Sequence, residues 1–130
     1  MRELVKVYKV LSDESRLRVL NLLLERECCV CEVMQAIDIS QSKASRILSA
    51  LYDAGILTLR RDGLWALYSI DRDGMDAYLK DIVEATTRAF KGNKVMIADR
   101  ERLMRAERVG PSCVKKMRNA DTIRQPQTQS

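Results

Sequence analysis

Two short apolar stripes at helical spacing, separated by a brief turn, constrain the fold of this 130-residue chain more than any other feature. The first stripe consists of Val30, Val33, Met34 and Ile37, and the second of Ala44, Ile47, Leu48 and Leu51. Apolar residues that recur at steps of three and four lie on one face of a helix. Ser40 is a preferred N-cap for the second helix, and Gly55 is a preferred stop. The pattern predicts two short helices joined by a tight turn, which is a helix-turn-helix.

A β-hairpin is predicted directly after this pair of helices. Residues 56–60 and 64–70 are the strand candidates, and Arg61-Asp62-Gly63 lies between them. Asp-Gly is typical of a hairpin turn. Before the pair, helices are expected over residues 3–11 and again after Ser12, which is a suitable N-cap. This order predicts a mostly α fold with a β-hairpin wing, which is the winged helix-turn-helix.

The second half of the chain carries an apolar seam that suits helix pairing. A long helix is expected from Asp73, an interruption at Gly92-Asn93, and a further helix over residues 94–108. The seam consists of Met75, Leu79, Ile82, Thr86 and Ala89. Its alternating steps of four and three suit a partner helix, so we expect a homodimer in which the first helix takes part. Residues 1–92 are then the DNA-binding and dimerisation domain, and 93–130 a helical extension with a basic, partly disordered tail.

The outward face of the second helix of the pair has the composition of a DNA-reading surface. It is polar and basic, it lacks glutamate, and its members are Gln41, Ser42, Lys43, Ser45, Arg46 and Ser49. Such side chains bond base edges and phosphates in the major groove. The wing adds Arg60 and Arg61 beside its tip. Either feature alone is also typical of an ordinary solvated surface, but the two together predict binding to double-stranded operator DNA. A winged helix that binds only protein is the alternative.

The overall charge contributes little to this prediction. The net charge of the chain is +5, but residues 1–99 contain fifteen basic and fifteen acidic residues, so the excess lies in the tail. The sequence after Met1 does not resemble a signal peptide, and no apolar run approaches the ~20 residues of a membrane span. We therefore expect a cytoplasmic protein with no membrane partner. The absence of histidine and of a glycine-rich cofactor loop argues against an enzyme.

Cysteines are the most distinctive chemical feature of the chain. Cys28, Cys29 and Cys31 lie within four residues, and Cys113 lies in the tail. This spacing is a poor disulfide framework, and a reducing compartment leaves the thiols free to bind a soft ion. Arsenite and antimonite favour three thiolates in a pyramid. The residues offer two such sets, Cys28 with Cys29 and Cys31, or Cys29 and Cys31 with Cys113.

The position of the cysteines leads to expectations about their chemistry. None of the first three lies on the apolar stripe of the helix that they begin, so we expect no packing role for Cys29 and Cys31. A helix N-terminus with Arg26 nearby is expected to lower the pKa of these thiols. Cys28 is open to a second interpretation as a small buried hydrophobe, and Cys113 as an incidental thiol.

Several segments of the chain resemble one known family, the ArsR/SmtB transcriptional repressors. The resemblance covers residues 3–90 and includes the second-helix signature at 13–20, the recognition helix at 40–57 and the wing at 60–70. The sequence ECCVCEV at 27–33 looks like the metal box E-L-C-V-C-[DE]-L. Its C-x-C implies the arsenic, antimony, cadmium and lead branch, with Cys29 and Cys31 as ligands, and the resemblance is to the arsenical-resistance type. Where arsenite sensors of the family often carry a third cysteine, this chain has Met34.

The resemblance implies a repressor that is released from its operator when arsenite or antimonite binds to cysteine thiolates. In a regular helix residues i and i+2 point about 200° apart. We therefore expect Cys29 and Cys31 to bind one ion only if the start of their helix is distorted, which would disturb the following recognition helix. The alternatives are a repressor switched by thiol oxidation or persulfide, with Cys28 paired with Cys31 or through Cys113, or one switched by cadmium or lead.

Overall fold

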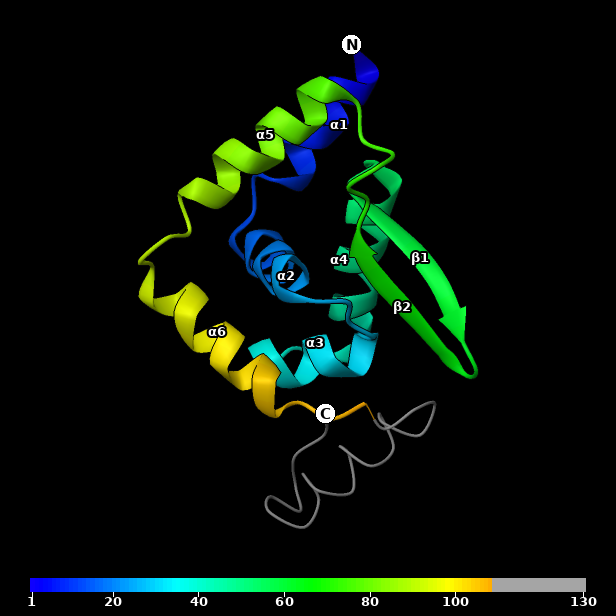
Figure 1. Cartoon of the computed structure of the whole chain (residues 1–130), viewed down its shortest axis with the longest axis vertical. Coiled ribbons are helices and arrows are strands. Elements are labelled where there is room, and N and C mark those ends of the chain that lie inside the picture. The colour runs from blue at the N-terminus through cyan, green and yellow to red at the C-terminus, as the bar shows by residue number, and fades with distance from the viewer. Residues whose placement is uncertain (109–130) are drawn as a thin grey trace.

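The computed structural model describes residues 1–108, which form six helices and one two-stranded antiparallel sheet (Figure 1). The elements are α1 (Arg2–Val10), α2 (Glu14–Glu25), α3 (Val30–Ile37), α4 (Gln41–Asp53), β1 (Leu57–Asp62), β2 (Trp65–Ile70), α5 (Ala77–Arg88) and α6 (Lys94–Arg105). This order confirms the predicted winged helix-turn-helix, with α3 and α4 as the helix pair and the β1–β2 hairpin as the wing. Cys113 and the basic tail lie outside the described residues.

Residues at the helix ends explain where the helices begin and stop. Ser40 accepts a hydrogen bond from a backbone N–H of the first turn of α4 at 3.1 Å, as predicted for its N-cap. Gly55 follows α4 with a φ of +85°, a left-handed conformation that glycine adopts without strain. The prediction for α2 is wrong by one residue. Asp13 is its N-cap, because the Ser12 hydroxyl instead donates to a carbonyl at the end of α1.

A third segment of the chain pairs with the two-stranded wing. Asp62 pairs with Trp65, so the hairpin loop is Gly63-Leu64 and begins two residues later than predicted, because Arg61 and Asp62 continue the strand. On the other edge of β2, the backbone of Cys28 exchanges two hydrogen bonds with that of Tyr68, at 3.0 and 2.9 Å. The segment that precedes α3 is therefore joined to the wing by backbone pairing.

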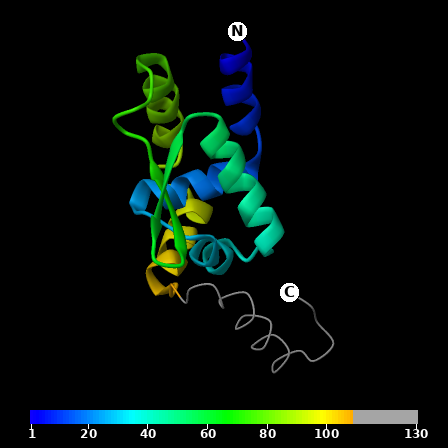
Figure 2. The ribbon, with the colours of Figure 1, turned by 90° about the vertical axis from the view of Figure 1, so that its right-hand side faces the viewer.

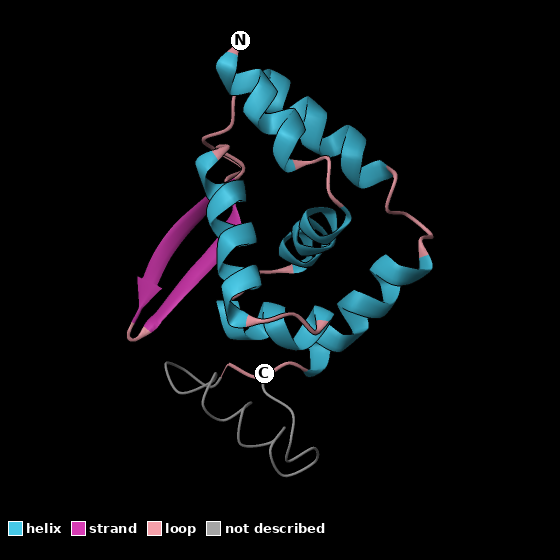
Figure 3. Ribbon diagram, turned by 180° about the vertical axis from the view of Figure 1, so that it is seen from behind, coloured by secondary structure: helices cyan, strands magenta, loops and turns pink. Residues whose placement is uncertain are grey.

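The hydrophobic core surrounds α2, which lies at the centre of the other helices (Figure 3). Leu20 and Leu22 of α2 and Leu48 and Leu51 of α4 are fully buried there. Burial of such side chains is the main favourable contribution to folding. No helix among residues 1–108 is long and apolar enough to cross a bilayer.

Part of the seam predicted for dimerisation packs within its own protomer. Leu79 is 5% exposed and belongs to the core of its own protomer, and Met75 and Ile82 pack against that core. Of the other seam residues, Thr86 is half-buried and Ala89 is exposed, so the spacing identified an inward-facing set only in its first half. Helices α1 and α5 both extend to one end of the molecule (Figure 2), and they carry the exposed apolar residues Val5 and Tyr8 of α1 and Tyr78 of α5.

Helix α6 packs against α2 and α3 and is fixed there by polar contacts. Its Asp99 is fully buried and accepts two hydrogen bonds from the Arg18 guanidinium of α2, at 2.7 and 2.8 Å. The amide of Asn21, also on α2, donates to the backbone oxygen of Met96 at 3.0 Å. Buried groups paired in this way specify one position for α6.

Candidate nucleic-acid interface and thiol site

The face of α4 opposite the core is available to a ligand as large as DNA. Ala44, Ile47, Leu48 and Leu51 are buried, so the predicted DNA-reading residues lie outward. Of these, Gln41, Ser42, Lys43, Arg46 and Ser49 are exposed and Ser45 is half-buried. Neither Lys43 nor Arg46 makes an ion pair within residues 1–108. Their donors are therefore free to bond a base edge or a phosphate.

The two wing arginines differ in their surroundings. Arg60 donates two hydrogen bonds to the carboxylate of Glu27, at 2.7 and 2.8 Å. This guanidinium lowers the pKa of Glu27. Arg61 points to the opposite face of the hairpin, is exposed, and has no ion-pair partner in the described part of the chain. Among the described residues, Arg61 is thus available to contact DNA, whereas Arg60 is already paired with Glu27.

All three cysteines of the 28–31 segment are buried, which agrees with the second interpretation of Cys28 as a small buried hydrophobe and is contrary to the prediction for Cys29 and Cys31. Cys28, Cys29 and Cys31 are 0%, 4% and 2% exposed. The prediction considered only the apolar stripe of α3. It could not include the wing strand and the chain after α6, which cover the outer side of this segment.

Cys28 faces away from the other two thiols. Cys28 belongs to the main core, whereas Cys29 and Cys31 form a separate apolar cluster with Leu67, against which Trp65 packs. Successive side chains of an extended segment point to opposite faces, and the pairing of Cys28 with β2 makes this segment extended. The structure therefore brings together two thiols of the predicted set. We define the thiol cluster as Cys29, Cys31, Leu67 and Trp65.

Cys29 is also the N-cap of α3. Its sulfur accepts a hydrogen bond from the Glu32 backbone N–H, and the Glu32 carboxylate accepts one from the Cys29 N–H at 2.9 Å, which completes a capping box. The predicted separation of Cys29 and Cys31 by about 200° is wrong, because Cys29 is extended, with φ −92° and ψ 169°, and precedes the helix. Both thiols reach the same cluster while α3 is intact.

The pKa values of Cys28 and Cys29 are raised by burial, whereas the sequence predicted that they would be lowered. Desolvation raises the pKa of Cys28 to about 12; the carboxylate of Glu32 adds to this rise, and Arg26 opposes it. Desolvation raises the pKa of Cys29 as well, although its sulfur accepts hydrogen bonds from backbone N–H groups, which lower the pKa. In a buried apolar environment the neutral form of a thiol is favoured.

Glu32 organises the charged groups around the thiol cluster. Its carboxylate is buried and pairs with Arg26 at 2.6 Å and with Arg108 at 3.1 Å. Burial opposes ionisation, but the Cys29 N–H and the two guanidinium groups outweigh it and lower the pKa of Glu32. A buried carboxylate held by this many donors fixes the residues around it.

The chain that follows α6 closes over the thiol cluster. The Gln35 side chain donates to the sulfur of Cys31 at 3.2 Å and to the backbone oxygen of Glu107 at 2.8 Å. The Arg108 guanidinium lies over the Trp65 ring, 5.9 Å from its centroid. Sequence reasoning missed Gln35, Trp65 and Arg108, since no motif connects three residues so distant in the chain.

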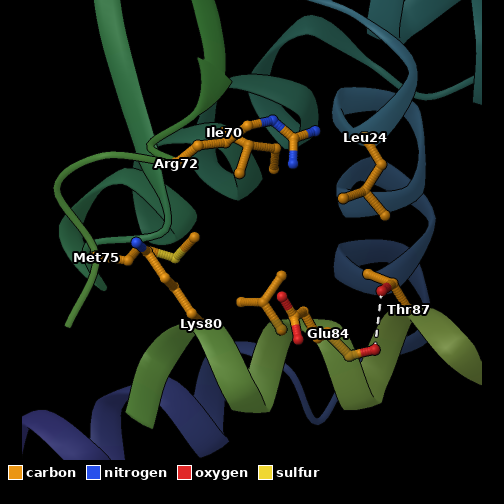
Figure 4. Close-up of a pocket in the computed structure, with 8 residues that line it drawn as sticks. Leu24, Ile70, Arg72, Met75, Lys80, Glu84 and Thr87 are labelled. Atoms are coloured by element: carbon orange, nitrogen blue, oxygen red, sulfur yellow. Dashed lines mark hydrogen bonds between the residues drawn. The ribbon is translucent and has the colours of Figure 1, made fainter. Parts of the chain in front are cut away.

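Within residues 1–108 no three Cys, Asp or Glu side chains are arranged to hold a metal ion between them. A third thiolate from Cys113 lies outside the described residues. A cavity of about 290 Å³ between α2, the end of β2 and α5 is separate from the thiol cluster (Figure 4). It is lined by Leu24, Ile70, Arg72, Met75, Lys80, Val83, Glu84 and Thr87, none of which belongs to the predicted sites.

A helix-turn-helix with a free polar and basic face, followed by a wing with an exposed arginine, defines a winged-helix DNA-binding regulator. Residues 13–58 match the family described as bacterial regulatory protein, arsR family. The arsenic resistance transcriptional regulator ArsR1 of Pseudomonas putida is 38% identical over 106 residues, which cover 76% of this chain and 83% of that protein. The chain belongs to the ArsR family and is a DNA-binding transcriptional repressor, not an enzyme.

Other similar proteins are also repressors or winged helix-turn-helix DNA-binding domains. The arsenical resistance operon repressor of Escherichia coli is 42% identical over 67 residues, which cover 51% of this chain and 57% of that protein. Among solved structures, the transcriptional repressor BigR from Xylella fastidiosa is 29% identical with a TM-score of 0.58, covering 72% of this chain and 88% of that one. The homodimeric winged helix-turn-helix domain of Mb0332 from Mycobacterium bovis is 26% identical with a TM-score of 0.56, covering 68% and 75%.

Proposed function

We propose that this repressor acts as a homodimer, binds operator DNA through the outward face of α4 and the wing, and is released when arsenite or antimonite binds to Cys29 and Cys31. One observation carries the proposal. Two buried thiols share one cluster at the start of the helix that precedes the recognition helix. Soft thiolates are the ligands that trivalent arsenic and antimony prefer. The names of the relatives from Pseudomonas putida and Escherichia coli, both arsenical resistance regulators, support this class of inducer.

Because Cys29 is the N-cap of α3, binding of an ion to its sulfur can affect the DNA-binding helix. A sulfur engaged by an ion no longer serves as an acceptor for the Glu32 N–H, and loss of an N-cap costs a helix about 1 kcal/mol. Helix α3 packs against α4, so a change at the start of α3 reaches the DNA-reading face. Coupling free energies between two ligands are typically about 1–3 kcal/mol, which is large enough for release.

The homodimer is placed at the end of the molecule where α1 and α5 extend. Val5, Tyr8 and Tyr78 are exposed there. Closed two-fold dimers bury the same surface of both copies, and a contiguous apolar surface is the expected site for such an interface. The homodimeric Mb0332 domain supports the assembly.

The test is a DNA-binding titration with several ions in parallel. Operator fragments selected by the protein from a random DNA pool are labelled, and anisotropy is followed as arsenite, antimonite, cadmium, lead and zinc are added. We expect release by arsenite and antimonite in the parent protein, and none in Cys29→Ser or Cys31→Ser, both with normal affinity for DNA. Normal release in both variants would refute the proposal. Release by cadmium or lead alone would reassign the inducer.

A further inference from the structure

The indole of Trp65 carries an unpaired hydrogen-bond donor at the thiol cluster. Its Nε1 atom is buried and has no hydrogen-bond partner, which holds for no other buried side-chain nitrogen or oxygen in residues 1–108. A buried N–H without an acceptor is unfavourable, and such a group in a native protein calls for an explanation. An acceptor supplied by a ligand would remove this deficit.

The position of Trp65 connects this donor with the two thiols. Trp65 packs against Cys29, Cys31 and Leu67, and Arg108 lies over its ring at 5.9 Å from the centroid. A buried, unpaired N–H and the two sulfurs therefore belong to one packed cluster. An indole nitrogen only donates, so the ligand atom that it selects must be an acceptor.

The thiol cluster provides two sulfurs, whereas trivalent arsenic forms three bonds. Cys28 faces the main core, and Met34 occupies the position of a third cysteine. Arsenous acid, As(OH)₃, condenses with two thiols to form two As–S bonds. Two As–O bonds break, each hydroxyl leaves as water with one thiol proton, and no oxidation state changes. One hydroxyl remains on the arsenic, and its oxygen is a hydrogen-bond acceptor.

We propose that Cys29 and Cys31 hold trivalent arsenic as a dithiolate that keeps one hydroxyl, and that the Trp65 Nε1–H donates to the oxygen of that hydroxyl. This inference rests on the proposed function and specifies its ligand. The site then recognises arsenous acid by two sulfur bonds and one hydrogen bond, and it needs no third thiolate from the tail or from a partner chain.

The test compares two arsenicals in a variant that lacks only the donor. Trp65→Phe keeps an aromatic ring and removes the N–H. Phenylarsine oxide also condenses with two thiols, releasing one water, but its third substituent is a phenyl ring that accepts no conventional hydrogen bond. Affinities of the full chain for both reagents are measured by calorimetry. We expect Trp65→Phe to bind arsenite roughly tenfold more weakly and phenylarsine oxide with unchanged affinity. Tyr68→Phe, on the same strand, is the matched control and should bind both like the parent.

X-ray absorption of the arsenite complex gives a second measurement, with two sulfurs and one oxygen expected around arsenic. Three sulfurs, together with weaker arsenite binding in Cys113→Ser, would overturn the inference in favour of a third thiolate. Unchanged arsenite affinity in Trp65→Phe, or an equal loss for both reagents, would also overturn it. These results differ from failure of the proposed function, in which the parent binds neither reagent through Cys29 and Cys31 or binds them without releasing DNA.

Discussion

The side-chain nitrogen of Gln35 lies 3.2 Å from the sulfur of Cys31. The same amide donates to the backbone oxygen of Glu107 at 2.8 Å, and its oxygen accepts from the Glu107 N–H at 3.0 Å. Gln35 therefore connects a thiol of the proposed inducer site to the chain that follows α6.

This connection predicts the effect of Gln35→Ala. The variant loses the contacts to Cys31 and Glu107, and we expect the free energy of unfolding in urea to fall by about 1–2 kcal/mol, since each such hydrogen bond contributes roughly 1 kcal/mol. Limited proteolysis should cut the chain near residue 107 faster. Glu101→Ala, an exposed change on α6, is the control and should resemble the parent. Equal proteolysis of both variants would contradict this role for Gln35.

The different surroundings of the basic residues predict different effects on DNA binding. Arg46→Ala should weaken operator binding by about 1–3 kcal/mol if this side chain contacts a base edge. Arg61→Ala should weaken binding to all sequences and reduce the salt dependence by roughly one phosphate contact. Arg60→Ala should have a smaller effect, because its guanidinium is already paired with Glu27. Anisotropy at several salt concentrations gives all three values, and an Arg60→Ala effect as large as that of Arg61→Ala would count against the distinction.

The burial of the thiols predicts their order of reactivity. At pH 8 iodoacetamide reacts with thiolates, and a pKa of about 12 leaves Cys28 almost entirely protonated. We expect Cys28 to be alkylated most slowly among the three neighbouring cysteines, and the rate to rise as the pH approaches 12 or the protein unfolds. Mass spectrometry of peptides from a time course measures each rate. Preferential labelling of Cys28 in the folded protein would show that the main core does not enclose it.

Substitutions at a buried residue of α5 and at an exposed residue of α1 should have different effects on folding and on dimerisation. Leu79→Glu places a charge in the core of the protomer, so we expect loss of helical circular dichroism rather than a folded monomer. Tyr8→Glu changes an exposed residue of α1 and should give folded monomers in sedimentation experiments. A folded dimer of unchanged affinity in Tyr8→Glu would place the interface elsewhere.

The sequence allowed the architecture to be predicted because its signals are local. Apolar spacing located α3 and α4, Ser40 and Gly55 located the ends of α4, and Asp-Gly located the hairpin turn within two residues. The surroundings of Cys29 and Cys31 depend on contacts between residues far apart in the chain. The Arg108 guanidinium reaches Glu32 across 76 positions, and no helical periodicity encodes such a contact. For this reason the burial of these two thiols was not predicted, and the pKa shift of Cys29 was predicted in the wrong direction.

The backbone pairing of Cys28 with Tyr68 determines which property of the protein an inducer can change. Cys28 pairs with the edge of the wing, and the next residue, Cys29, is the N-cap of α3, the first helix of the helix-turn-helix. The wing is therefore joined to the start of α3, which packs against the recognition helix α4, and we expect a rearrangement there to change the position of the wing relative to α4. The spacing between a major groove and its neighbouring phosphates is a fixed property of duplex DNA. A repressor whose two contacts no longer match that spacing cannot make both at once, so we expect the proposed inducer to weaken operator binding by changing this geometry and not by covering the DNA-reading face.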